Sequence, residues 1–102
     1  MIMRVWRTGV DETRAAEYER FAREVSLPMF RAQPGFLGLL FGRDGGSCVV
    51  TTLWEDPAAA DALERSASYR DTVARISSAG FLVGESTVER FAVHGSLLPR
   101  VS

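Results

Sequence analysis

The chain has 102 residues, 46% of them hydrophobic and 25% charged, with a formal net charge of −1. This length and balance favour one soluble globular domain and give no electrostatic case for nucleic-acid binding, which needs a clustered basic surface. All 12 basic residues are arginine, so Schiff-base chemistry on a lysine is excluded.

Location and metal binding are also limited by composition. No segment approaches the ~20 apolar residues of a membrane-spanning helix, and the N-terminus lacks the apolar core of a signal peptide. A cytoplasmic location is therefore the default expectation. A single cysteine, Cys48, allows no intrachain disulfide and fits a small buried residue. One histidine and one cysteine, without clustered ligands, do not make a metal site.

A strand and an amphipathic helix are predicted at the start of the chain. Residues 2–9 alternate and carry β-favouring side chains, which is typical of a strand. Asp11 offers a helix N-cap, and residues 12–25 place apolar side chains at helical spacing. Pro28 lacks an N–H donor and crowds the preceding turn, so we expect it to kink or end this helix.

A β-hairpin is predicted next. Two apolar segments, residues 36–42 and 48–55, flank the turn sequence RDGGS. Simple alternation puts Phe36, Gly38 and Leu40 on one face of the first segment. Glycine inside a strand often marks a close approach, so we expect a bulky group from a helix or a partner's sheet to lie against Gly38.

The second half of the chain predicts helices followed by a last strand. Asp56 before Pro57 is a typical helix start, and the stretch around Ser66 suggests a break between two helices. Gly80 fits a helix end, and residues 85–94 predict a strand.

The predicted order is therefore β-α-β-β-α-β. This is the ferredoxin-like arrangement of the α+β class, an antiparallel sheet with its helices on one face. We expect residues 1–95 to form a single domain and residues 96–102 to form a C-terminal tail.

The sheet should need cover on its second face. Both alternating sets of the two hairpin strands carry apolar side chains, although the helices can cover only one face. At roughly 25 cal/mol per Å² of apolar surface, leaving the other face in water would be costly. We therefore predict a homodimer that packs sheet against sheet.

Several motifs resemble the antibiotic biosynthesis monooxygenase family over residues 2–93. They are a Pro-Gly-Phe element before the second strand, a Trp-Glu pair ending the third, and a Ser-x-x-Tyr element in the alanine-rich helix that follows: Pro34-Gly35-Phe36, Trp54-Glu55 and Ser66 to Tyr69. The resemblance implies a dimeric α+β barrel with a pocket between helices and sheet in each subunit.

The resemblance also implies chemistry. Some members oxidise electron-rich aromatic compounds with O₂ and no cofactor, whereas others degrade haem. The haem-degrading members use an Asn, a Trp and a His at places that correspond here to Trp6, Leu63 and Val73. None of these matches, and the chain contains no asparagine. Haem degradation is therefore disfavoured, and no cofactor is expected.

Three aromatic residues are candidates for substrate binding. Trp6 lies where the family places a pocket residue, and an indole can stack on a planar ring and donate one N–H bond. Tyr18 and Tyr69 lie on the apolar stripes of the predicted helices and could present their hydroxyls to a substrate. The alternative for all three is a place in the core.

The candidates for catalysis are two arginines and the histidine. Arg4 and Arg7 fall on opposite faces of the first strand, so one of them could enter the pocket and hold a phenolate or carboxylate. His94 is the natural candidate for a general base, because its unperturbed pKa lies near neutrality. An ion pair or a solvated strand end for the arginines, and a surface position for His94, are the alternatives.

Two functions follow from these residues. The first is cofactor-independent monooxygenation of a small phenolic, quinol or polyketide-like compound in an apolar pocket. The second is a barrel of the same fold that binds a small apolar ligand, or serves as an interaction module, without catalysis. Haem binding through His94 is a third hypothesis.

Overall fold

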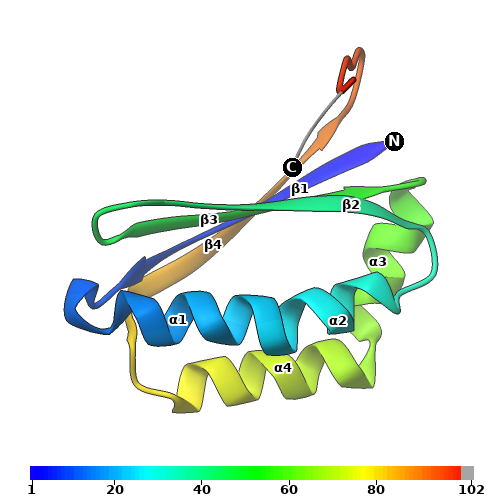
Figure 1. Ribbon diagram of the computed structural model, residues 1–102. Coiled ribbons are helices and arrows are strands. Elements are labelled where there is room, and N and C mark those ends of the chain that lie inside the picture. Colours follow the sequence, from blue (N-terminus) through cyan, green and yellow to red (C-terminus); the bar gives the residue numbers. More distant parts are fainter. Residues whose placement is uncertain (100–102) are drawn as a thin grey trace.

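The computed structural model describes residues 1–99, so residues 100–102 of the expected tail lie outside it. Figure 1 shows the sheet above and the helices below. The elements are β1 (Ile2–Val10), a short 3₁₀ turn (Glu12–Arg14), α1 (Ala15–Phe21), a π-helical turn (Ala22–Ser26), α2 (Leu27–Arg31), β2 (Phe36–Asp44), β3 (Ser47–Trp54), α3 (Pro57–Arg65), α4 (Ala67–Ser78) and β4 (Leu82–Ala92).

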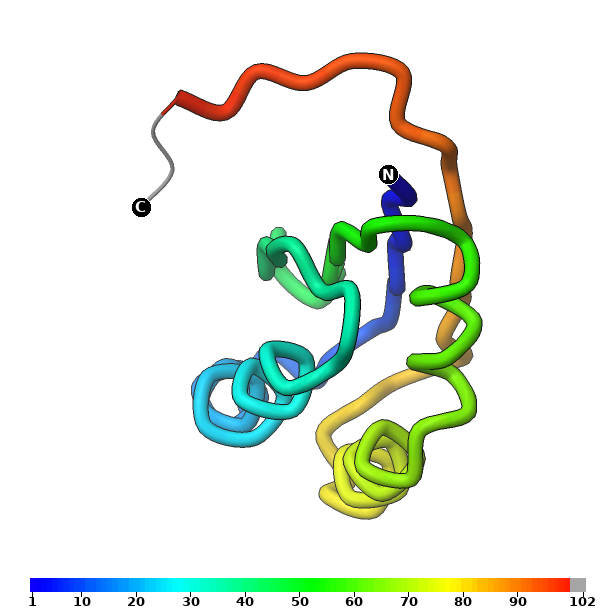
Figure 2. The backbone as a smooth tube through the Cα atoms, turned by 90° about the vertical axis from the view of Figure 1, so that its right-hand side faces the viewer, coloured from blue at the N-terminus to red at the C-terminus, as the bar shows by residue number. Residues whose placement is uncertain are grey.

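The four strands form one antiparallel sheet in the order β2-β3-β1-β4. Seen end-on, α1 and α2 form one rod and α4 a second rod beside it, both on the same side of the sheet, while the chain after β4 runs on the opposite side (Figure 2). The predicted ferredoxin-like fold is confirmed. Within residues 1–99, no helix is long and apolar enough to cross a membrane.

Of the two expected effects of Pro28, a kink or an end of the first helical run, the structure contradicts the end. The chain stays helical to Arg31, because the π-helical turn Ala22–Ser26 comes just before Pro28. In that turn the backbone N–H of Leu27 donates to the carbonyl of Ala22. Pro28 therefore stands in the first turn of α2, where the lack of an N–H is tolerated.

The hairpin strands contain a β-bulge that simple alternation does not anticipate. Phe36 is opposite Trp54, but Gly38 is opposite the adjacent Leu53, so Leu37 is an extra residue in β2. Phe36 consequently faces the helices with Trp54, whereas Gly38 and Leu40 face away. The expectation that Phe36 and Gly38 share a face is wrong for this reason.

The second helical region breaks where the sequence predicts. The Asp56 side chain accepts from the backbone N–H of Ala59 at 2.8 Å and caps α3. Ser66 ends that helix and caps α4 through the N–H of Tyr69. β4 starts at Leu82, earlier than expected, and ends before His94.

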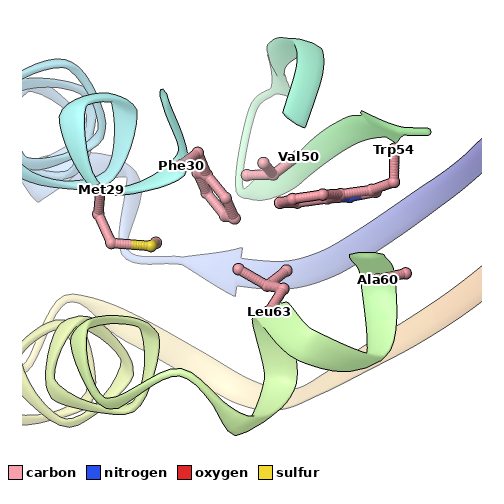
Figure 3. Close-up of a cluster of buried hydrophobic side chains, with 6 residues drawn as sticks. All are labelled: Met29, Phe30, Val50, Trp54, Ala60 and Leu63. Carbon is pink, nitrogen blue, oxygen red and sulfur yellow. The ribbon is translucent and has the colours of Figure 1, made fainter. Parts of the chain in front are cut away.

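The interior consists of two apolar clusters. The first gathers around Trp54 at the α3 end of the sheet (Figure 3): Met29, Phe30, Val50, Trp54, Ala60 and Leu63. The second gathers around Phe81 at the other end: Val10, Tyr18, Cys48, Ile76 and Phe81. Trp6 packs against both clusters, so it stands at their junction.

Candidate active site

A pocket lies between the sheet and the two helical rods, in the gap between the two clusters. Its free volume is about 50 Å³. The walls come from β1, β2, β3, the long helical run and α4, and most of them are apolar: Arg4, Trp6, Tyr18, Ala22, Ser26, Met29, Phe30, Phe41, Val50, Tyr69, Thr72, Val73 and Ile76. The site is thus a small apolar chamber with a few polar groups.

Arg4 supplies the one formal charge among the lining residues. It lies on β1 facing the helices and is 3% exposed. Its Nη2 donates to the Tyr69 hydroxyl at 2.8 Å, and its Nε donates to Oε1 of Glu64 at 3.3 Å. The guanidinium carbon is also 5.3 Å from the centre of the Tyr69 ring. A buried guanidinium is therefore held in one orientation at the pocket wall.

Glu64 joins Arg4 to the protein surface. Its Oε1 also accepts from Nη2 of Arg90 at 2.9 Å, and Arg90 donates in turn to Asp61 at 2.7 Å. Burial raises the pKa of Glu64, but the hydrogen bonds and charges of Arg90 and Arg4 outweigh it and hold that pKa below its usual value. Glu64 therefore stays ionised and balances the buried charge of Arg4.

Two aromatic side chains bring polar groups to the pocket. Trp6 is half-buried, and its indole N–H has no hydrogen-bond acceptor among residues 1–99. Tyr18 is 3% exposed and lies beside Cys48, and burial together with the Cys48 thiol raises the pKa of Tyr18 above its usual range. The Tyr18 hydroxyl therefore keeps its proton and can only serve as a neutral hydrogen-bonding group.

Comparison with known proteins identifies the family to which the chain belongs. The family model described as antibiotic biosynthesis monooxygenase matches residues 1–75. The chain belongs to this family. No curated protein matches it in a sequence search.

Solved structures of other proteins share the fold of this family member. The cofactor-independent oxygenase SnoaB from Streptomyces nogalater, solved as a mutant, is 22% identical with a TM-score of 0.73, covering 97% of each chain. The ActVA-Orf6 monooxygenase from Streptomyces coelicolor, solved with nanaomycin D, is 25% identical with a TM-score of 0.73, covering 97% of this chain and 92% of that one. A protein of unknown function from Nitrosomonas europaea is 16% identical with a TM-score of 0.78, covering 98% and 95%.

The structure brings four of the six candidate residues of this family member to one pocket. Arg4, Trp6, Tyr18 and Tyr69 all line it. Because side chains alternate along β1, Arg7 points to the other face of the sheet, where it is exposed and pairs with Glu89 at 3.2 Å. His94 is exposed, follows the end of β4 and does not line the pocket.

Other residues that line the pocket, or that pair with Arg4 beside it, are not apparent from the sequence. Glu64 follows Asp61 by three residues, which places both carboxylates on one face of α3. That spacing does not reveal that they meet Arg4 and Arg90, which come from strands far away along the chain. Phe41 and Met29 look like ordinary core residues, since nothing local marks the gap between the two clusters.

The site offers nothing that would hold a metal ion. Within residues 1–99, no three His, Cys, Asp or Glu side chains come together as a candidate ligand set. The polar groups at the pocket are a guanidinium, hydroxyls and an indole N–H, which are mainly hydrogen-bond donors. Such a set suits an anionic or hydroxylated ligand.

Proposed function

We propose that this protein is a cofactor-independent monooxygenase that oxidises an electron-rich hydroxylated aromatic compound in the pocket beside Arg4. The observation that carries the proposal is the buried Arg4 guanidinium, bonded to Tyr69 at 2.8 Å in a pocket that Trp6 also lines. The lining of this apolar chamber carries one fixed positive charge, and Glu64, which balances that charge, is not among the lining residues, so the chamber favours the anion of a weakly acidic aromatic hydroxyl over its neutral form.

The three residues have separate roles in this proposal. Arg4 stabilises the phenolate. The Tyr69 oxygen already accepts a hydrogen bond from Arg4, so its own proton is free to be donated to the substrate oxygen. Trp6 packs against the ring and orients it, and its free N–H supplies a further donor.

The chemistry itself belongs to the substrate and O₂. The phenolate transfers one electron to O₂, and the two radicals then form a C–O bond at a ring carbon. When the O–O bond of this peroxide breaks and the ring C–H proton leaves, a carbonyl remains. One oxygen atom enters the product, the other leaves as water with the two hydrogens lost by the substrate, and four electrons have passed from the ring to O₂.

Relatives with the same fold support this class of reaction. SnoaB is described as a cofactor-independent oxygenase, and the Streptomyces coelicolor monooxygenase was solved with the ligand nanaomycin D. The family match covers residues 1–75, which include every pocket residue except Ile76.

Oxygen consumption tests the proposal directly. Purified protein is mixed with a panel of hydroquinones and anthrones, and O₂ uptake is followed against boiled protein. We expect substrate-dependent uptake that falls at least ~10²-fold in Arg4→Met, the loss typical of one electrostatic group. Arg7→Met is the matched control on the same strand and should behave like the wild type. Uptake that is no faster than with boiled protein across the panel would reject the proposal.

A second candidate function is ligand binding without catalysis. It is favoured by the lining itself, which contains no His, Asp or Glu to act as a general base. The same experiment separates the two. Saturable binding that depends on Arg4, without any O₂ uptake, would assign the protein to this second class.

We also propose that the protein is a homodimer formed through the sheet face opposite the helices. Three exposed apolar side chains lie on that face or in its bulge, namely Leu37, Leu40 and Phe91, which are 43–54% exposed. The half-buried Val49 and Leu53 lie among them. The chain after β4, with Leu97 85% exposed, runs on this same side (Figure 2). A second copy would remove this surface from water.

Sedimentation of a glycine variant tests the dimer. A Cβ atom at Gly38 would meet nothing within 4 Å in the single chain, so the isolated fold has space for a side chain at this position. We expect the wild type to sediment at twice 11.2 kDa and Gly38→Val to shift toward the monomer. Ala16→Val, on the exposed face of α1, is the control. A wild type that stays monomeric at micromolar concentration would contradict the proposal.

A further inference from the structure

The pocket is small, and its size limits the substrate. Resting on the function proposed above, we infer that the substrate class is single-ring phenols and hydroquinones, and that fused two-ring and three-ring compounds are excluded. The inference comes from the free volume, from the side chains that close the pocket, and from the position of its opening.

The free volume does not exceed what one six-membered ring requires. The pocket measures about 50 Å³, which is room for roughly four ordered waters at ~10–15 Å³ each. An apolar cavity that takes one benzene molecule measures ~150 Å³, so even a single ring requires the side chains at the opening of this pocket to move. Pockets for larger ligands measure ~300 Å³ or more.

Packed aromatic side chains close both ends of the pocket. At one end, Phe30 is 6% exposed and its ring centre is 6.5 Å from those of both Trp54 and Tyr69. At the other end, Tyr18 is 3% exposed and stands edge-on to Phe81 at 6.0 Å. Because each ring is held by neighbouring rings, neither end can open for a second fused ring without disrupting a core cluster.

The opening of the pocket lies on the helix side. Val73 is 41% exposed, and every other lining residue is buried or half-buried. Val73 follows Tyr69 by one helical turn, so the opening is next to the Arg4–Tyr69 pair. Phe41, on the edge strand β2, forms another wall of the pocket, and its removal would extend the pocket toward that edge of the sheet.

A binding experiment on the whole chain tests the size limit. The chain has two tryptophans, so an amide-correlated NMR spectrum contains two indole N–H signals. Trp6 lines the pocket, whereas Trp54 is 0% exposed and donates to Thr52, which makes its signal an internal reference. Phenol and 2-naphthol are titrated separately under anaerobic conditions, so that no oxygenation occurs. A spectrum of Trp6→Phe assigns the two signals.

We expect phenol to shift the Trp6 signal saturably and to bind at least ~10-fold more tightly than 2-naphthol, a difference of about 1.4 kcal/mol. Phe41→Ala should improve 2-naphthol binding by at least ~10-fold relative to phenol. Leu39→Ala is the matched control, because Leu39 faces the helices from the same strand but does not line the pocket. If Phe41→Ala does not fold, Phe41→Leu provides a smaller enlargement.

The outcomes separate this inference from the proposed function. Two-ring binding at least as tight as phenol binding in the wild type, lost in Arg4→Met, would overturn the size limit and leave the oxygenase proposal standing. An unchanged ring preference in both Phe41 variants would also overturn it. A Trp6 signal that no ring compound moves would overturn both.

Discussion

The two tryptophans of this chain lie on adjacent strands, face the same helices and have opposite surroundings. Trp54 is fully buried, its N–H is bonded to Thr52 at 2.8 Å, and two phenylalanine rings pack edge-on to it. Trp6 is half-buried, borders free space, and its N–H has no acceptor among residues 1–99. The end of the interior around Trp54 is closely packed and its indole N–H is hydrogen-bonded. The middle, around Trp6, contains free space and an indole N–H without an acceptor.

This difference shows where a site can exist in so small a fold. A filled region converts apolar burial into stability and leaves no room for a ligand. An unfilled region loses that packing, but its free donors and free volume can be used for binding. The contrast therefore predicts that changes near Trp54 act on folding, and that changes near Trp6 act on binding.

The largest effect should come from Trp54→Ala. Removing a fully buried tryptophan is expected to lower the free energy of unfolding by about 3–5 kcal/mol. Trp6→Ala should cost less than half as much, because Trp6 is half-buried and already borders a space. Urea unfolding of both variants measures the difference. Equal losses would mean that the two regions are not packed differently.

Gly35 and Gly38 provide the next test. Gly35 lies in the closely packed region near Trp54, whereas Gly38 lies on the sheet face opposite the helices. Gly35 has φ of +79°, and a Cβ atom there would lie 2.5 Å from the Cβ of Ala59 in α3. Gly35→Ala should therefore cost about 1–3 kcal/mol. Gly38→Ala meets nothing in the single chain and should change stability by under ~1 kcal/mol at concentrations where the protein is monomeric.

Thermal or urea unfolding of the two alanine variants at low protein concentration measures these costs. A Gly38→Ala loss as large as that of Gly35→Ala in the monomer would contradict the open position of Gly38. Gly46→Ala is not a suitable control, because a Cβ atom there would lie 3.2 Å from the carbonyl oxygen of Val10.

Most of the fold follows from local patterns, and its exceptions have a physical cause. Strand alternation is enough to separate Arg4 from Arg7, and the Gly-rich turn is enough to place the hairpin. The bulge at Leu37 is not predictable in this way. Both alternating sets of β2 are apolar, so hydrophobic pattern alone does not specify which residue faces which side.

The site is predictable as a set of candidates rather than as an arrangement. Arg4, Trp6 and Tyr69 are recognisable as residue types that suit an aromatic anion. Their meeting depends on contacts between residues more than 60 positions apart, such as the bond from Arg4 to Tyr69. The pocket itself is a property of two clusters that fail to touch, which no local segment encodes.

Tyr69→Phe should separate binding from stability at the pocket. The change removes a hydroxyl that accepts a hydrogen bond from the buried Arg4 guanidinium at 2.8 Å, and the expected loss of stability is about 1.5–3 kcal/mol. The expected loss of phenol affinity, measured by the NMR titration, is at least ~10-fold relative to the wild type. Unchanged phenol affinity in this variant would show that the Tyr69 hydroxyl does not contact the ligand.

The smallest expected effect concerns Glu64, which connects the pocket to the surface. Its pKa lies below the ordinary value of 4.5 in the folded protein. A lowered folded-state pKa adds stability above the unfolded-state pKa and loses it as the pH falls through the folded-state pKa. The side chain is 42% exposed, so screening keeps this contribution under ~1 kcal/mol.

Glu64→Gln should therefore be slightly less stable than the wild type at pH ~6, and its stability should approach that of the wild type below pH ~4. Urea unfolding at both pH values measures this, with Glu24→Gln, an exposed carboxylate without an ion pair in residues 1–99, as the control. An equal gap at both pH values would mean that Glu64 acts by packing, and that the charge of Arg4 is balanced by another group.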